Sequence, residues 1–175
     1  MTDAFHSIES GLREKVIEHL FVGDLLRILW QRGMRDIEVL RTEVDRAGYD
    51  IVLEANGVMR HVQLKASHKT ARTARVGIHV SLESKPSGCV IWVFFDPDTM
   101  TLGPFLWYGG DPGERIPSLG DRIGKHSKGN SQGHKAERPN IRMLNKGQFT
   151  SINSAEDLID VLFGDVERDE TAPAA

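Results

Sequence analysis

Cysteine, long apolar runs and net charge are all scarce in this chain of 175 residues. Its one cysteine, Cys89, cannot form an internal disulfide, and its place in the run CVIWVFF suits a buried thiol without a catalytic role. No run approaches the roughly 18 apolar residues that cross a bilayer, and the N-terminus does not resemble a signal peptide. We therefore expect a cytoplasmic protein without a membrane segment.

The net charge of −3 argues against a protein that coats nucleic acid by bulk electrostatics, but the charges are unevenly distributed. Residues 55–82 contain no acidic side chain and carry the cations Arg60, Lys65, Lys69, Arg72 and Arg75. Residues 122–146 are a second basic segment, in which Glu137 is the one acid. These two segments are where we expect polyanions to bind.

The length of the chain suits one substantial hydrophobic core. We predict a single domain over residues 1–165, followed by an acidic, flexible tail over residues 166–175. Apolar residues at spacings of three and four predict an amphipathic helix over 8–32, with Gly33 at its end and Gly23 as a potential break. The apolar stripe expected to face the core consists of Val16, Ile17, Leu20, Phe21, Leu25, Ile28 and Leu29. Ser154 is the expected N-cap of a second helix that ends at Phe163.

Alternating apolar and polar residues predict strands between these helices, at 37–44, 49–66, 76–82, 89–95, 103–108 and 140–149. The Asn56-Gly57 dipeptide favours a two-residue turn, so residues 49–66 are predicted to form a β-hairpin. Residues 109–139 have no periodicity and are predicted to be a long loop. This order predicts an α/β (α+β) fold in which helices flank a mixed sheet.

Three polar residues of the predicted hairpin project together from an otherwise apolar sheet. Gln63 and Lys65 lie two apart on one strand and so share a face, and the turn brings Asp50 beside them. Burial of a carboxylate and an ammonium is costly unless each has a partner, and a divalent cation accounts for both. Asp50, the Gln63 amide and the Leu64 backbone carbonyl supply the oxygen ligands that Mg²⁺ prefers, and Lys65 would position and activate water.

The helix run EHLFVGDLLRILWQRG, the segment GYDIVLE and the segment VQLKAS together resemble the PD-(D/E)XK nuclease superfamily, in particular its small bacterial branch with an E…D…QxK pattern. The resemblance covers residues 14–95 and implies a restriction-endonuclease-like core. It also implies hydrolysis of DNA phosphodiester bonds with Mg²⁺ or Mn²⁺. Matched to this sequence, the pattern makes Glu18 the helix ligand of the metal, with Glu14 as the alternate, beside Asp50, Gln63 and Lys65.

The chain departs from the superfamily pattern at two positions. Gln63 replaces an acidic residue and would bind a cation more weakly than a carboxylate. Tyr49 occupies the position of the proline that gives the motif its name. A catalytically inactive nuclease-fold module that binds nucleic acid or a protein is therefore the alternative function.

Phosphate contacts are expected from the basic segments and from Ser67, which shares the face of Lys65. The residues predicted to bind nucleic acid are Ser67, Lys69, Arg72, Arg75, Lys125, Lys128, Lys135 and Arg138. DNA is the expected substrate, with RNA as the other nucleic acid that fits this chemistry. Cleavage of both strands by one small domain would favour a homodimer.

Two plainer interpretations stay open at this point. Gln63 and Lys65 could be the solvent-facing half of an ordinary strand, with Val62 and Leu64 facing the core. The basic residues 122–146 could equally be a solvated loop without a ligand. In that case the protein would bind neither metal nor DNA.

Overall fold

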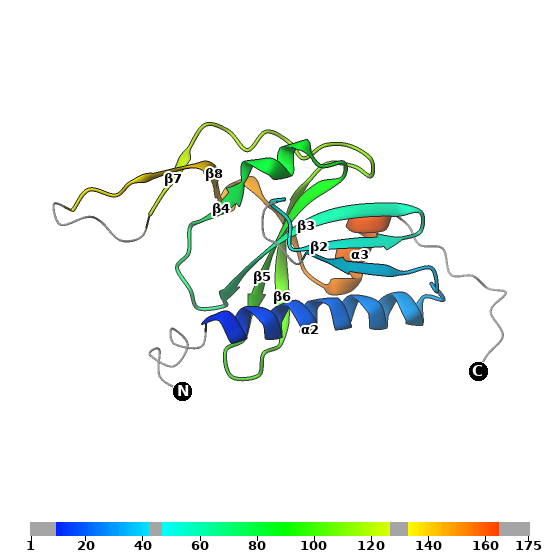
Figure 1. Ribbon diagram of the computed structural model, residues 1–175. Coiled ribbons are helices and arrows are strands. Elements are labelled where there is room, and N and C mark those ends of the chain that lie inside the picture. The colour runs from blue at the N-terminus through cyan, green and yellow to red at the C-terminus, as the bar shows by residue number, and fades with distance from the viewer. Residues whose placement is uncertain (1–9, 43–46, 127–132, 165–175) are drawn as a thin grey trace.

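A computed structural model describes residues 10–42, 47–126 and 133–164 (Figure 1). The described elements are α2 (Ser10–Gln31), β1 (Glu38–Arg41), β2 (Ile51–Ala55), β3 (Val58–His68), β4 (Arg75–His79), η1 (Val80–Ser84), β5 (Gly88–Phe95), β6 (Leu102–Gly109), β7 (Ile123–Lys125), β8 (Glu137–Asn145), η2 (Lys146–Gln148), β9 (Thr150–Ile152) and α3 (Ala155–Phe163). The predicted α+β class is confirmed. The tail over 166–175 lies outside the described residues.

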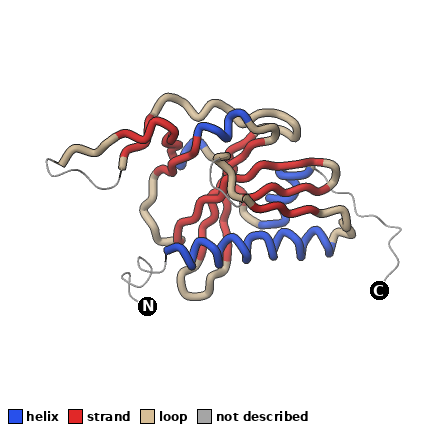
Figure 2. The backbone as a smooth tube through the Cα atoms, in the orientation of Figure 1, coloured by secondary structure: helices blue, strands red, loops and turns tan. Residues whose placement is uncertain are grey.

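The main sheet has six strands in the order β1-β2-β3-β5-β6-β9. Figure 2 shows the strands in red and the helices in blue. Its strand pairs are antiparallel except β3 and β5, which run parallel because β4 and η1 connect them. A smaller sheet has the order β4-β8-β7. Among the described helices, none combines the length and apolar character that crossing a bilayer requires.

The predicted hairpin of β2 and β3 is confirmed, with Asn56 and Gly57 at φ 53° and 67° in the turn. Both residues tolerate this left-handed conformation, which the two-residue turn requires. The two strands differ in length. β2 begins at Ile51, opposite Val62, whereas β3 runs on to His68 paired with β5 alone. Over the last six residues of β3, one edge of this strand therefore has no pairing with β2.

Both helices cover one face of the main sheet and build the larger core, which includes Ile17, Phe21, Ile91 and Leu158. α2 runs unbroken through Gly23, and Ser154 caps α3 by accepting a hydrogen bond from Asp157 N–H at 3.0 Å. The predicted inward stripe of α2 is wrong at two positions. Val16 and Leu20 are 36% and 40% exposed, because the helix is apolar on its outer side as well.

The smaller sheet packs on the opposite face of the main sheet, where Ile78 and Leu144 meet Trp92 and Phe94. Two predictions need correction here. The strand expected over 76–82 ends at His79, because the chain turns into η1, where Ser81 N–H donates to Nδ1 of the His79 ring. The loop expected over 109–139 contains β7 and the start of β8, which the lack of apolar alternation concealed.

Arg60 is fully buried, although its sequence context placed it with the surface cations. Its guanidinium donates to the carbonyls of Leu162 and Val161 at the C-terminus of α3, at 2.7 and 3.2 Å, and to Gly110 O at 2.8 Å. Burial lowers the pKa of this group. A cation is favourable at this position because helix C-terminal carbonyls carry partial negative charge.

We predict that Arg60→Met lowers the free energy of unfolding by about 2–4 kcal/mol, because three carbonyls lose a charged donor. Urea unfolding followed by circular dichroism measures the change. The matched control is Arg115→Met, at an exposed position, which should change stability by less than about 0.5 kcal/mol. Equal effects of the two substitutions would show that Arg60 does not hold α3 in place.

Candidate functional site

Asp50 lies at the point where β2 leaves β3. Its backbone N–H donates to Val62 O at 2.8 Å, and its carboxylate Oδ2 accepts from Leu64 N–H at 2.6 Å. The carboxylate thus takes the place of the strand partner that β3 loses beyond Val62. In an extended strand the N–H and C=O of one residue point to the same side, so the Leu64 carbonyl also lies along this open edge.

Gly48 explains how the chain enters this position. Its φ of +79° is in the region that favours glycine, and a Cβ there would lie 3.1 Å from Leu82 N and 3.2 Å from the His79 side chain. The segment before Asp50 therefore passes close to the junction of β4 and η1. The sequence contained this signal, a glycine two residues before the aspartate.

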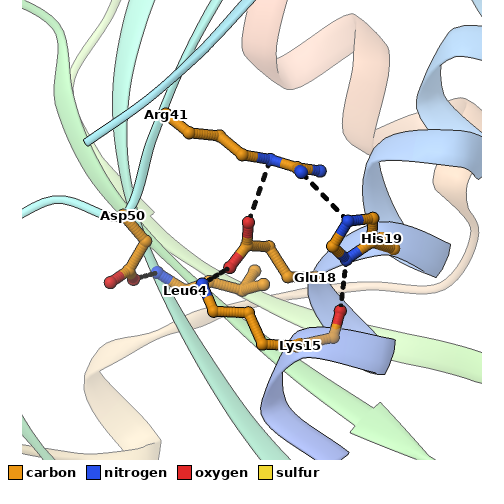
Figure 3. Close-up of polar contacts among 6 residues, drawn as sticks. All are labelled: Lys15, Glu18, His19, Arg41, Asp50 and Leu64. Atoms are coloured by element: carbon orange, nitrogen blue, oxygen red, sulfur yellow. Dashed lines mark hydrogen bonds and ion pairs between the residues drawn. The ribbon is translucent and has the colours of Figure 1, made fainter. Parts of the chain in front are cut away.

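Glu18 points inward from α2 and is 8% exposed. Its two carboxylate oxygens accept from Lys15 Nζ at 2.9 Å and from Arg41 Nε at 3.1 Å (Figure 3). Arg41 also donates to His19 Nε2 at 3.0 Å, and the other ring nitrogen of His19 donates to Lys15 O. Glu14, the alternate helix ligand, is exposed.

A cleft of about 490 Å³ joins these residues across the open edge of β3. Glu18 and Ile17 of α2 contribute to one wall, and Asp50 lies at the edge itself. The full lining consists of Arg13, Glu14, Lys15, Ile17, Glu18, Asp50, Leu64, Lys65, Ala66, Ser67, Thr73 and Val76. The structure therefore brings four predicted site residues, Glu18, Asp50, Leu64 and Lys65, into one cavity.

Lys65 and Ser67 share a face of β3, as the alternation predicted. Ser67 Oγ accepts a hydrogen bond from Trp92 Nε1 at 3.0 Å, which fixes the hydroxyl oxygen. A serine hydroxyl also has one donor, and this N–H···O bond does not use it. Ser67 can therefore donate to an anionic oxygen in the cleft.

Gln63 is not among the residues that line the cleft. Its side chain is 6% exposed, and its Oε1 accepts from His79 N–H at 3.1 Å. This bond ties β3 to the end of β4. An amide oxygen has two lone pairs, so one acceptor position of Gln63 remains beyond this bond.

The donors at the cleft suit a hard cation. Within the described residues, no three His, Cys, Asp or Glu side chains are grouped closely enough to hold a metal ion, so a zinc site built from three or four such ligands is not found there. Mg²⁺ differs, since it is commonly held by one or two carboxylates together with water and substrate phosphate. The carboxylates of Glu18 and Asp50, with the Leu64 carbonyl, fit that pattern.

Exposed cationic side chains lie beside the cleft and on the smaller sheet. Lys69, Arg72 and Arg75 are exposed on and beside the segment that joins β3 to β4, whose Thr73 lines the cleft. Lys125, Lys135 and Arg138 are exposed on β7, before β8 and on β8, the part of the smaller sheet that extends away from the main sheet in Figure 1. Lys128 lies outside the described residues.

Sequence reasoning missed the cations that hold Glu18. The spacing of Lys15 and Glu18 is a recognisable helical pair, but Arg41 approaches from β1 and no local pattern indicated it. The interpretation of Cys89 is supported, because the thiol is fully buried and burial raises its pKa to about 12. A neutral thiol at this depth is a poor nucleophile.

No protein-family model matches the chain, and a search of curated proteins finds no match. Among solved structures, the chain is similar to a bacterial homing endonuclease. The two share 18% sequence identity and a TM-score of 0.34, over 71% of this chain and 85% of the endonuclease. Membership of the PD-(D/E)XK superfamily stays a prediction.

Substitutions at Asp50 can separate its structural role, as the acceptor for Leu64 N–H, from its predicted role as a metal ligand. We predict that Asp50→Asn costs about 1 kcal/mol or less, because the amide oxygen still accepts from Leu64 N–H, whereas Asp50→Leu costs about 2–3 kcal/mol. Urea unfolding of the two variants beside the unsubstituted protein measures both values. Equal losses would show that the strand edge does not need an acceptor at residue 50.

Proposed function

We propose that the chain is a metal-dependent nuclease that hydrolyses DNA phosphodiester bonds in the cleft at the open edge of β3. One observation carries the proposal. Two carboxylates, Glu18 and Asp50, meet a lysine, Lys65, in one cavity, and exposed cations lie beside it. Carboxylates suit a cation, the lysine suits an anionic transition state, and the neighbouring positive charge suits a polyanion.

In this proposal Glu18 and Asp50 hold Mg²⁺ or Mn²⁺, with the Leu64 carbonyl as a third oxygen. The bound cation would lower the pKa of a water molecule and neutralise phosphate oxygens. Lys65 would hold the attacking water and stabilise the charge that develops on the phosphate, and Ser67 would donate to a phosphate oxygen. The side chain of Lys15 is 68% exposed, so it can leave Glu18 at little cost when a cation binds.

Gln63 is assigned a supporting place in this site. Its bond to His79 N–H fixes the amide, and the remaining acceptor position of Oε1 would contribute a neutral oxygen to the cation or to one of its waters. A neutral ligand reduces metal affinity relative to a carboxylate. The proposal therefore implies a weakly held cation that is stabilised further by substrate phosphate.

The alternative function is a catalytically inactive module of the same fold that binds nucleic acid or a protein. Two contacts favour it: the Gln63 oxygen already accepts from His79, and both oxygens of Glu18 are already paired with cations. Such a module would keep the basic surface and would not require a metal. Cleavage and metal binding separate the two functions.

We predict that Asp50→Asn, Lys65→Met and Glu18→Gln each lower the rate of Mg²⁺-dependent nicking of plasmid DNA by about 100-fold or more, because each removes a group that acts on the transition state. Manganese at about 100 times its Kd should raise the free energy of unfolding of the unsubstituted protein by about 2.7 kcal/mol. Asp50→Asn should lose this stabilisation.

The matched control is Glu156→Gln, an exposed carboxylate on α3 that does not line the cleft, which should keep both cleavage and stabilisation by Mn²⁺. Gln63→Glu preserves the acceptor for His79 and should bind Mn²⁺ more tightly. Nicking that survives Asp50→Asn and Lys65→Met together would refute the nuclease assignment. DNA binding without metal-dependent stabilisation would favour the inactive module.

The smaller sheet gives a separate prediction for DNA affinity. Lys125→Ala and Arg138→Ala should each weaken binding to duplex DNA of any sequence and reduce the slope of log K against log salt by about 1, because each phosphate contact releases counterions. Fluorescence anisotropy at several salt concentrations measures the slope. Arg115→Ala, at an exposed position near the start of β5, is the control and should leave the slope unchanged. A slope that neither Lys125→Ala nor Arg138→Ala changes would remove the smaller sheet from the interface.

A further inference from the structure

The outer face of α2 carries large apolar side chains that the described residues leave in contact with solvent. Leu12 and Trp30 are each 63% exposed, and Val16, Leu20 and Leu26 are 36%, 40% and 37% exposed. α2 lies at the surface of the molecule over its full length (Figure 1). The Arg35 guanidinium lies 3.8 Å from the centroid of the Trp30 ring, and apart from this contact the described residues leave the large apolar side chains of this face uncovered.

These five residues form one stripe, which we call the α2 stripe. At 100° per residue, all five fall within about 60° of the direction in which Gly23 points, opposite the buried face. Gly23 thus lies in the middle of the stripe. From Leu12 to Trp30 the stripe runs about 27 Å along the helix.

Gly23 has no explanation within the protomer. A Cβ at this position would meet no heavy atom within 4 Å, so neither packing nor a turn requires glycine. Glycine is also among the least favourable residues in a helix interior. Its usual value on a helix surface is that it permits close approach of another backbone.

We propose that the α2 stripe is a dimer interface, where a second copy of α2 packs antiparallel across a two-fold axis at Gly23. Such an axis requires a surface that is complementary to itself. The stripe meets this requirement: Leu20 and Leu26 lie three residues on either side of Gly23, and Val16 and Trp30 lie seven residues on either side. This inference is independent of the proposed nuclease activity.

Two polar residues, His19 and Arg27, also fall within this 60° sector, and the charge of Arg27 favours the antiparallel arrangement. Asp24 and Arg27 pair within the helix at 3.5 Å. In a parallel pair, each Arg27 would lie level with the Arg27 of the second copy. In the antiparallel pair the two Arg27 lie about 12 Å apart along the axis, and each lies about 7.5 Å along the axis from the Asp24 of the second copy. The two Asp24 lie about 3 Å apart along the axis, but at about 100° from the direction of Gly23 they point away from the seam.

The area that the α2 stripe can bury sets the expected affinity of the dimer. Specific interfaces bury about 800 Å² per partner, and one helix face about 27 Å long supplies less than that. The dimer should therefore be reversible, with a Kd in the micromolar range. Sedimentation velocity of the full chain from about 1 to 200 µM should show a monomer that converts to a dimer as concentration rises.

Two substitutions test the stripe. Gly23→Gln and Leu26→Glu should each weaken the dimer at least tenfold, the first by blocking backbone approach and the second by placing a charge in the seam. Gly23→Gln should also raise the thermal midpoint of the monomer, because glutamine favours the helix more than glycine does. Met59→Glu is the control, since Met59 is 42% exposed and lies off the stripe, and it should leave the Kd unchanged.

The direction of packing is tested by cross-linking. A mixture of Leu20→Cys and Leu26→Cys proteins should form the mixed disulfide in preference to either symmetric one, because residue 20 of one copy lies level with residue 26 of the other. Cys89 is fully buried and should not compete in this reaction. Preferred symmetric disulfides would overturn the antiparallel arrangement. A monomer at every concentration would overturn the dimer.

Discussion

The hydrogen bond from Leu64 N–H to the Asp50 carboxylate is the contact on which the cleft depends. A strand edge cannot lose its neighbour without exposing unpaired backbone groups, and inside a protein such groups need partners. Asp50 supplies one acceptor just before β2 begins, so β3 can continue as an edge for six more residues. The cleft is the space that this separation opens between α2, β3 and the segment before β4.

Two charged side chains, Arg60 and Glu18, are buried among the described residues, and they show how a structural ion differs from an exchangeable one. Arg60 is bound by backbone carbonyls whose positions are fixed by α3 and by the chain after β6. Glu18 is bound by the side chains of Lys15 and Arg41, which are 68% and 41% exposed. Exposed side chains reorient at little cost, whereas carbonyls of a packed helix do not. Glu18 is therefore the buried charge whose partners a ligand can replace.

Local patterns in the sequence were sufficient for the hairpin, for α3 and for the shared face of Lys65 and Ser67, because a turn, a cap and alternation are each set by residues close in the chain. They were insufficient where the contacting residues are distant in the sequence. Arg41 reaches Glu18 across the fold, and Gln63 meets His79 rather than the cleft. Arg60 looked like a surface cation, since its three partners are carbonyls that no residue type reveals.

The outer face of α2 explains a further failure of sequence reasoning. Periodicity identified the helix, but apolar residues on both sides gave no single inward direction, so Val16 and Leu20 were assigned to the core. The charged residue Glu18 is buried while these two are exposed, which binary patterning alone does not allow. In the proposed dimer two requirements resolve the conflict, since the inner face supplies a carboxylate to the cleft and the outer face packs on a second copy. α2 is then a helix between two interfaces, and its orientation is fixed from both sides.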